Sequence, residues 1–278
     1  MITSAQNAKI KLVRSLMGRA KERREAGMFV VEGVRLVEEA AKGDWSLVTV
    51  LFDKSLSERG MSQVEGLRSR GVEVEAVSEN LMKSLSETET PQGILAILQF
   101  SELPIPDSSN FILIPDHIRD PGNLGTLLRS AAATGVQAVL LPPETTDAFA
   151  PKVLRAGMGA HFRVPIHKMA WGEIEQVCKS ANGQMCKSAN GQMSKLANLQ
   201  IYIADMDGKS CWETDLRQPL ALIIGGEADG ASEQALKSAN EQISIPMAGN
   251  VESLNAGVAG SVLMFEVVRQ RSAGSDQL

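Results

Sequence analysis

The feature that most restricts the fold is a series of short apolar segments between residues 111 and 245. Stretches of helical character fall between most of them, and each apolar segment has the length of a buried strand. Strands this apolar that alternate with helices predict a parallel sheet covered by helices on both faces. Ligands of such sheets bind at the carboxyl ends of the strands. The expected strands are Phe111–Pro115, Ala138–Leu141, Phe162–Pro165, Gln200–Ala204, Leu220–Ile224 and Ile243–Ile245.

The first hundred residues predict a smaller α/β domain of their own. A segment rich in proline and serine, SELPIPDSSN at 101–110, separates the two regions and lacks apolar periodicity. We therefore expect one domain over residues 1–100, a linker over 101–110 and a second domain over 111–278. The elements expected in the first domain are strands at Phe29–Glu32, Leu47–Phe52, Val72–Val77 and Gly93–Gln99, and helices at Val34–Ala41 and Ser57–Arg70.

Charge is distributed unevenly along the chain. The net charge is −5, yet residues 1–28 carry seven basic side chains against Glu22 and Glu25, so the remaining chain is strongly acidic. A basic segment on an acidic body is typical of a phosphate-binding surface. An amphipathic helix with a solvated face explains the segment equally well, because Ile10, Val13, Met17 and Ala20 recur at helical spacing.

Several classes of protein lack support in the sequence. No apolar run approaches the roughly 18 residues of a membrane helix, and no secretory signal is evident, so we expect a cytoplasmic protein. The three cysteines form no CxxC pair and the three histidines show no metal-ligand spacing, so we expect reduced thiols and no metal. The chain lacks the glycine patterns of dinucleotide-binding and P-loop sites and the GxSxG turn of α/β-hydrolases. An octapeptide, CKSANGQM, occurs twice in tandem at 178–193 and reads as a duplication that lengthens a surface segment.

The segment DHIRDPGNLGTLLRSAAATG (116–135) follows an expected strand and opens a helix. Pro121, Gly122 and Asn123 are expected to form the turn that caps this helix. Leu124, Leu127, Leu128 and Ala131 form one apolar stripe, and Arg129 lies off that stripe. The arginine is either an exposed surface residue or a functional group that projects toward the strand ends.

Two further segments combine small residues with polar ones at a strand end. LIIGGEADGAS (222–232) carries Glu227 in a glycine-rich turn, where a ligand can approach the backbone closely. ISIPMAGNVESLNAGVAGS (243–261) runs from a strand through a loop into a helix, with Ser253 and Asn255 at the junction. Taken singly, each is also explained by an ordinary strand-to-helix turn or an N-cap.

Together and in this order, the three segments resemble the SpoU/TrmH family of the SPOUT methyltransferases, over roughly residues 111–271. The sequences NAKIKLVRSL and FVVEGVRLVEEA near the N-terminus are similar, more loosely, to the substrate-binding domain that many members carry, a fold of the ribosomal protein L30e type. The resemblance implies a knotted α/β domain with a C-terminal trefoil knot, a homodimer whose site is completed across the interface, and S-adenosylmethionine as methyl donor. The implied reaction is methylation of a ribose 2′-hydroxyl in structured RNA, ribosomal or transfer RNA, with ribosomal RNA favoured.

The resemblance also implies roles for individual residues. The catalytic group expected from the motifs is Arg129, Asn123, Glu227, Ser253 and Asn255. The donor contacts expected are Gly225, Gly226, Ile245, Pro246, Met247 and Leu254. Because arginine stays protonated, we expect Arg129 to hold the RNA phosphate and hydroxyl rather than to act as a direct base.

The basic N-terminal segment then becomes a candidate RNA contact, through Lys9, Lys11, Arg14, Lys21, Arg23 and Arg24. Two alternatives remain open at this point. One is an RNA-binding or ribosome-assembly factor that keeps the fold without activity, and the other is a base methyltransferase of the wider SPOUT group.

Overall fold

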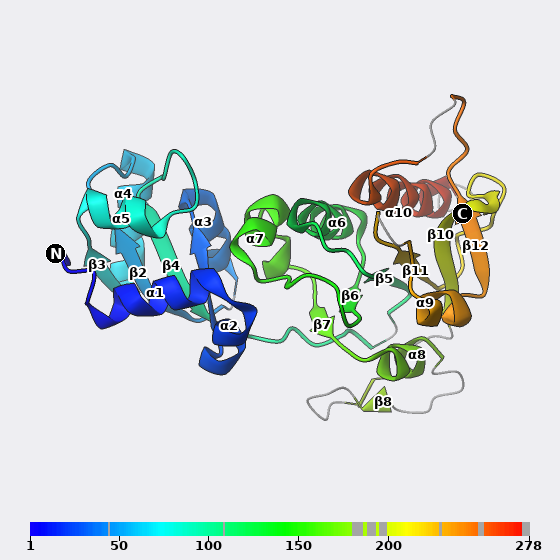
Figure 1. Ribbon diagram of the computed structural model, residues 1–278, viewed down its shortest axis with the longest axis horizontal. Coiled ribbons are helices and arrows are strands. Elements are labelled where there is room, and N and C mark those ends of the chain that lie inside the picture. Colours follow the sequence, from blue (N-terminus) through cyan, green and yellow to red (C-terminus); the bar gives the residue numbers. More distant parts are fainter. Residues whose placement is uncertain are drawn as a thin grey trace. The chain divides into compact units, whose positions relative to one another are not determined.

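The chain divides into two compact units, each with its own sheet. In the computed structural model the N-terminal unit comprises Met1–Ser101 and Phe149–Phe162, and the C-terminal unit comprises Glu102–Ala148 and Arg163–Leu278. The structure describes residues 1–43, 45–107, 109–179, 199–227, 230–249 and 253–273, together with the backbone of 186–187 and 193–194. Most of the octapeptide repeat therefore lies outside the described residues. Figure 1 follows the chain through both units.

The N-terminal unit is built on a four-stranded mixed sheet in the order β1-β4-β2-β3. The central strand β4 runs antiparallel to both β1 and β2, and β3 pairs parallel to β2. The apolar side chains that predict these strands are buried along β1, β2 and β4. The strands are β1 (Met28–Glu32), β2 (Leu47–Phe52), β3 (Glu73–Ala76) and β4 (Ile94–Gln99), and the helices are α1 (Ala8–Gly18), α2 (Ala20–Ala26), α3 (Val34–Lys42), α4 (Glu58–Ser69) and α5 (Glu79–Leu85).

The basic N-terminal segment forms two helices rather than one. The chain is extended at Arg19, between α1 and α2. Ile10, Val13 and Met17 are buried, as the helical spacing predicts. The guanidinium of Arg23 is also buried, and its Nη1 donates to the carbonyl oxygen of Leu16 at 2.7 Å. Arg23 therefore satisfies carbonyl groups that the end of α1 leaves without helical partners.

The segment Phe149–Phe162 belongs to the N-terminal unit, although the sequence places it within the second domain. It carries α7 (Pro151–Gly157) and the short 3-10 helix η1 (Ala160–Phe162). The ring of Phe149 lies 4.9 Å from that of Phe29 and 4.7 Å from that of Phe100. Aromatic packing of this kind contributes beyond simple burial, which explains why the segment leaves the sheet that precedes it.

The C-terminal unit is built on a six-stranded sheet in the order β12-β10-β11-β5-β6-β7. Every pairing in it is parallel, as the apolar segments predict. All five residues of β5 and of β11 are buried, because both faces of the sheet are covered. The strands are β5 (Phe111–Pro115), β6 (Ala138–Leu141), β7 (Ile166–Lys168), β10 (Gln200–Ser210), β11 (Leu220–Ile224) and β12 (Glu241–Ser244).

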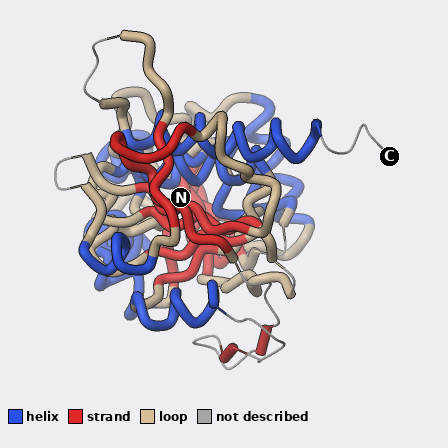
Figure 2. Tube along the Cα trace, turned by 90° about the vertical axis from the view of Figure 1, so that its right-hand side faces the viewer, coloured by secondary structure: helices blue, strands red, loops and turns tan. Residues whose placement is uncertain are grey.

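Two pairs of helices cover this sheet. Helices α6 (Pro121–Thr134) and α10 (Ala256–Ala273) pack together on one face, and α8 (Trp171–Lys179) and α9 (Glu233–Ser238) lie on the other (Figure 1). Small residues allow the close packing of α6 on α10: a Cβ added to Gly260 would meet Leu127 at 2.3 Å. After β12 the chain extends outward before it returns to the start of α10 (Figures 1 and 2).

Two strands differ most from their predicted bounds. The segment Phe162–Pro165 is not a strand, since β7 begins only at Ile166. Pro165 has no N–H to donate, and its carbonyl oxygen instead accepts from the N–H of Val139 at the edge of the ladder. Strand β10 continues to Ser210, but Ala204 and Lys209 both pair with Ile243, so residues 205–208 bulge out of the sheet.

Cys178 and Cys211 are buried free thiols, and burial raises the pKa of Cys178 to about 12. Among the described residues, no group of three histidine, cysteine or acidic side chains could hold a metal ion. No helix in the same part of the chain is long and apolar enough to span a bilayer.

Candidate active site

The three motif segments meet at the carboxyl edge of the parallel sheet. Asp116 follows β5, Gly225 follows β11 and Ile245 follows β12, and these strands lie in one sheet. Because parallel strands all end at the same edge, the turns that follow them share one side of the unit. Helices α6 and α10 pack on each other and begin at this edge.

The centre of the site is a set of hydrogen bonds among Asn123, Glu227 and Asn255, which we call the hub. The side-chain amide nitrogens of Asn123 and Asn255 each donate to Oε1 of Glu227 at 2.6 Å. The Nδ2 atom of Asn255 also lies 2.8 Å from Oδ1 of Asn123. One carboxylate oxygen therefore fixes two amides that come from different helices.

The hub stands where the first turns of α6 and α10 come together. The Oδ1 atom of Asn255 accepts from the N–H of Val258, so Asn255 caps α10 as the sequence indicates. The N–H of Ala256 points at Glu227 Oε1, at 3.3 Å. Free N–H groups at a helix start favour a negative charge, so α10 stabilises the Glu227 carboxylate. Helix α6 is capped by Asp120 and begins at Pro121, so the predicted cap by residues 121–123 is wrong by one residue.

A cavity of about 310 Å³, which we call the strand-end cavity, opens beside the hub. The ends of β10, β11 and β12, the loop before α10 and the first turns of α10 form its wall. Five of the six expected donor contacts line it, and Pro246 does not; Glu227 and Ser253 line it as well. The five are Gly225, Gly226, Ile245, Met247 and Leu254.

Two glycines in this wall allow the backbone to approach a neighbouring segment closely. A Cβ at Gly226 would lie 2.4 Å from the carbonyl oxygen of His117, and one at Gly225 would lie 2.7 Å from the backbone nitrogen of Ala231. Both separations are shorter than any stable contact. The GGE motif is therefore explained here by packing of three backbone segments as well as by access for a ligand.

The cavity wall has a distinct chemical character. Among the described residues that line it, the ionisable side chains are Asp205 and Glu227, and the remainder are backbone, small or apolar groups. Asp205 and Met206 also line the cavity and are not among the predicted site residues; they lie in the bulge after the first part of β10. Their position just after an apolar strand of a parallel sheet is the signal that identifies them.

The structure leaves Arg129 apart from the hub. It is exposed, and it follows Asn123 by six residues, about 9 Å along the axis of α6. Its neighbour Ser130 bonds to Ser261 of α10, with 2.7 Å between the two hydroxyl oxygens. No hydrogen bond or ion pair joins Arg129 to the part of the chain that the structure describes. Its guanidinium is thus available to a group from outside this chain.

The basic residues of the N-terminal helices differ in how available they are. Arg23 is buried, and Lys9 forms ion pairs with Glu73 and Glu75 that hold α1 to β3. Arg14 donates to the hydroxyl of Ser84. Of the six predicted RNA contacts, the exposed ones are Lys11, Arg14, Lys21 and Arg24, and Lys21 also lies 3.7 Å from Glu25.

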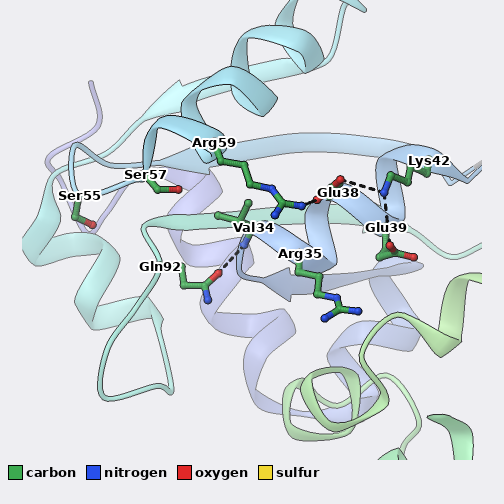
Figure 3. A pocket seen from close by; sticks show the side chains of 9 residues that line it. All are labelled: Val34, Arg35, Glu38, Glu39, Lys42, Ser55, Ser57, Arg59 and Gln92. Carbon is green, nitrogen blue, oxygen red and sulfur yellow. Dashed lines mark hydrogen bonds and ion pairs between the residues drawn. The ribbon is translucent and has the colours of Figure 1, made fainter. Parts of the chain in front are cut away.

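A second cavity, of about 680 Å³, lies in the N-terminal unit between α3 and the start of α4. Two of its three basic side chains are engaged, whereas Arg35 has no such bond among the described residues: Arg59 bonds to Glu38, and Lys42 lies 3.0 Å from Glu38 and 3.7 Å from Glu39 (Figure 3). The amide oxygen of Gln92 accepts from the N–H of Val34 at its rim (Figure 3). It contains no residue of the three motif segments of the C-terminal unit, so the strand-end cavity remains the candidate active site.

Two family models match this chain, one over each of two separate ranges. Residues 110–265 match the model of the SpoU rRNA Methylase family. Residues 7–96 match the model of the MRM3-like substrate binding domain. The first match spans the sheet of the C-terminal unit, the hub and the strand-end cavity.

Relatives and solved structures agree with these matches. An uncharacterized tRNA/rRNA methyltransferase of Synechocystis sp. is 31% identical over 99% of this chain and 95% of its own length. The 23S rRNA (guanosine(2553)-2′-O)-methyltransferase RlmP of Bacillus subtilis is 31% identical over 96% of this chain and 98% of its own. The crystal structure of the SpoU methyltransferase AviRb from Streptomyces viridochromogenes, in complex with AdoMet, superposes with a TM-score of 0.84 at 29% identity, covering 96% of this chain and 99% of that one.

Proposed function

We propose that this chain, which belongs to the SpoU rRNA Methylase family, transfers a methyl group from S-adenosylmethionine to a ribose 2′-hydroxyl of ribosomal RNA. Relatives that match nearly the whole chain are named for this reaction on 23S rRNA. The observation that carries the proposal is the hub of Asn123, Glu227 and Asn255 beside the strand-end cavity. It brings together one residue from each of the three motifs.

The strand-end cavity fits S-adenosylmethionine in size and in charge. Its volume of about 310 Å³ is at the lower end of the range for small-molecule sites. Its described wall has two carboxylates and lacks basic side chains, which suits a cationic donor better than a phosphate-bearing cofactor. When bound, S-adenosylmethionine supplies an electrophilic methyl group on a sulfonium. By motif position, Gly225, Ile245, Met247 and Leu254 would hold it, chiefly through backbone groups.

The chain's own residues then have to orient the ribose and assist loss of its proton. A 2′-hydroxyl is a weak nucleophile at neutral pH, so alignment and proton removal supply much of the rate. We assign Arg129 the role of holding the RNA phosphate, since its guanidinium is exposed, stays charged and matches phosphate geometry. The held phosphate oxygen accepts the hydroxyl proton in this scheme. The hub and Ser253 act as positioning residues at the cavity mouth.

RNA is the substrate because the acceptor is a 2′-hydroxyl, which DNA lacks. The N-terminal unit, which matches a substrate-binding domain, supplies further contacts to the RNA. Lys11, Lys21 and Arg24 are its exposed basic contacts in this proposal. We propose a cytoplasmic location, which the bacterial relatives named for 23S rRNA support.

We further propose a homodimer formed through α10, with the trefoil knot of the family in each subunit. Helix α10 exposes Val258, Val262 and Phe265, which are 47%, 37% and 53% accessible and recur at helical spacing. Contiguous apolar side chains on one helix face mark a surface that another protein covers.

The direct test combines donor binding with methyl transfer. The purified protein is titrated with S-adenosylmethionine by calorimetry and then incubated with tritiated donor and unmodified ribosomal RNA. We expect binding with one site per chain, and label that survives in 2′-O-methylated dinucleotides after alkaline hydrolysis. Failure to bind the donor would indicate a non-catalytic RNA-binding factor, and label in a base would indicate a base methyltransferase.

A further inference from the structure

Asp205 is held at the wall of the strand-end cavity by an interruption in β10. Ala204 and Lys209 both pair with Ile243 of β12, so residues 205–208 leave the ladder and return to it. A Cβ at Gly208 would lie 2.6 Å from the backbone of Gln242 and Ile243, so the bulge closes tightly against β12. This geometry turns Asp205 to the cavity and leaves Asp207 outside its lining.

The carboxylate of Asp205 has one oxygen in use and one available. Its Oδ1 accepts the N–H of Asp207 at 2.9 Å, which fixes the orientation of the side chain. No other hydrogen bond or ion pair joins this carboxylate to the described residues. A carboxylate that is half-buried and oriented is a strong acceptor that lacks its second partner.

The other carboxylate of the cavity is already committed. Oε1 of Glu227 accepts from Asn123, Asn255 and the N–H of Ala256, and belongs to the hub at the side of α6. Asp205 lies in the bulge of β10, and β10 lies on the far side of β11 from β5 and its helix α6. The two carboxylates therefore come from neighbouring strands of the cavity wall, Glu227 at the hub and Asp205 on the side toward β12.

We propose that Asp205 is a donor-recognition residue whose free oxygen accepts a hydrogen bond from the methyl donor, at the end remote from the methyl group. The inference rests on the proposed function. The donor carries two kinds of group that suit an acceptor-only carboxylate: the ribose hydroxyls and the ammonium of its amino acid part. Asp205 could recognise either group, and ligands that lack the amino acid part distinguish the two.

The test is calorimetry of the full-length protein with Asp205→Asn and the matched control Asp207→Asn. The first change keeps an oxygen for the N–H of residue 207 and replaces only the free acceptor. The second removes the same charge two residues further along the chain, outside the cavity lining. We expect Asp205→Asn to weaken S-adenosylmethionine binding by about 10- to 100-fold and Asp207→Asn to change it less than about twofold.

Methylthioadenosine, which keeps the ribose and lacks the amino acid part, identifies the recognised group. An equal loss with this ligand assigns Asp205 to the ribose, and a loss confined to S-adenosylmethionine and S-adenosylhomocysteine assigns it to the ammonium. If Asp205→Asn binds the donor as well as the wild type does, the role of Asp205 is overturned and the proposed function stands. Failure of the wild type to bind the donor overturns the proposed function instead.

Discussion

The Nδ2 atom of Asn255 lies 2.6 Å from Oε1 of Glu227, although 28 residues separate them in the sequence. Through this bond and the one from Asn123, a single carboxylate oxygen ties the start of α10 to the start of α6. Side chains that are locked in this way can hold a reacting ribose without loss of orientation at the moment of transfer.

Replacing Glu227 with alanine should therefore impair catalysis more than folding. Both amides lose their shared acceptor, and we expect methyl transfer to fall at least about 100-fold. Glu227→Gln keeps one acceptor oxygen and should retain more activity than Glu227→Ala. Single-turnover rates with labelled donor measure the effect. Glu233→Ala, a change at an exposed residue of α9, is the control; equal rates for it and for Glu227→Ala would contradict the role of the hub.

Arg129→Ala should abolish methyl transfer and leave donor binding unchanged, because Arg129 lies outside the strand-end cavity and carries the phosphate contact in our scheme. Arg129→Lys keeps the charge but loses the bidentate hydrogen bonding to phosphate, so an intermediate rate is expected. Turnover assays paired with calorimetry separate the two effects. Near-normal turnover in Arg129→Ala would remove this residue from the mechanism.

Gly226→Ala tests the close backbone packing at the cavity wall. The new Cβ would lie 2.4 Å from the carbonyl oxygen of His117, so either segment has to move. We expect a loss of about 1–3 kcal/mol in the free energy of unfolding and a weaker affinity for the donor. Gly66→Ala in α4 is the matched control, since nothing lies within 4 Å of its Cβ, and it should stabilise the protein by up to about 1 kcal/mol. Chemical denaturation of both variants decides; a Gly226→Ala protein as stable as wild type would contradict the packing argument.

Charge reversal at Lys11, Lys21 and Arg24 should weaken RNA binding and flatten its salt dependence. Each lost phosphate contact reduces the slope of log affinity against log salt by roughly one. Filter binding at several salt concentrations provides the slope. Arg68→Glu on α4 is the control for a general change of charge, because Arg68 is exposed and pairs only locally with Glu65. A slope that stays at the wild-type value would show that these side chains make no RNA contact and only form the solvated face of the helices.

The sequence predicted the parallel sheet well because its strands are buried on both faces and need no partner information to be recognised. In this sheet Phe111–Pro115, Ala138–Leu141 and Leu220–Ile224 have the predicted bounds. The strand predicted at Phe162–Pro165 failed because Phe162 packs on Trp45 in an aromatic cluster of the N-terminal unit. Contacts between segments so distant in sequence cannot be read from local periodicity.

The site shows the same division between local and distant information. The position of Asn255 just before an expected helix predicts that it caps that helix. Its bond to Glu227 depends instead on the order of strands in the sheet. Arg23 was grouped with the surface cations because its type is usually exposed. Only the fold shows that it is buried and bonded to the end of α1. Asp205 escaped notice because the bulge that turns it inward is set by pairing with β12.

The most direct test of the central claim is a map of ribose 2′-O-methylation in total RNA from cells with and without the gene. The account predicts a nucleotide of ribosomal RNA whose 2′-O-methyl group is lost in the deletion strain. The wild-type gene should restore the methyl group and Arg129→Ala should not. Identical methylation maps with and without the gene, for a protein that is expressed and folded, would contradict it.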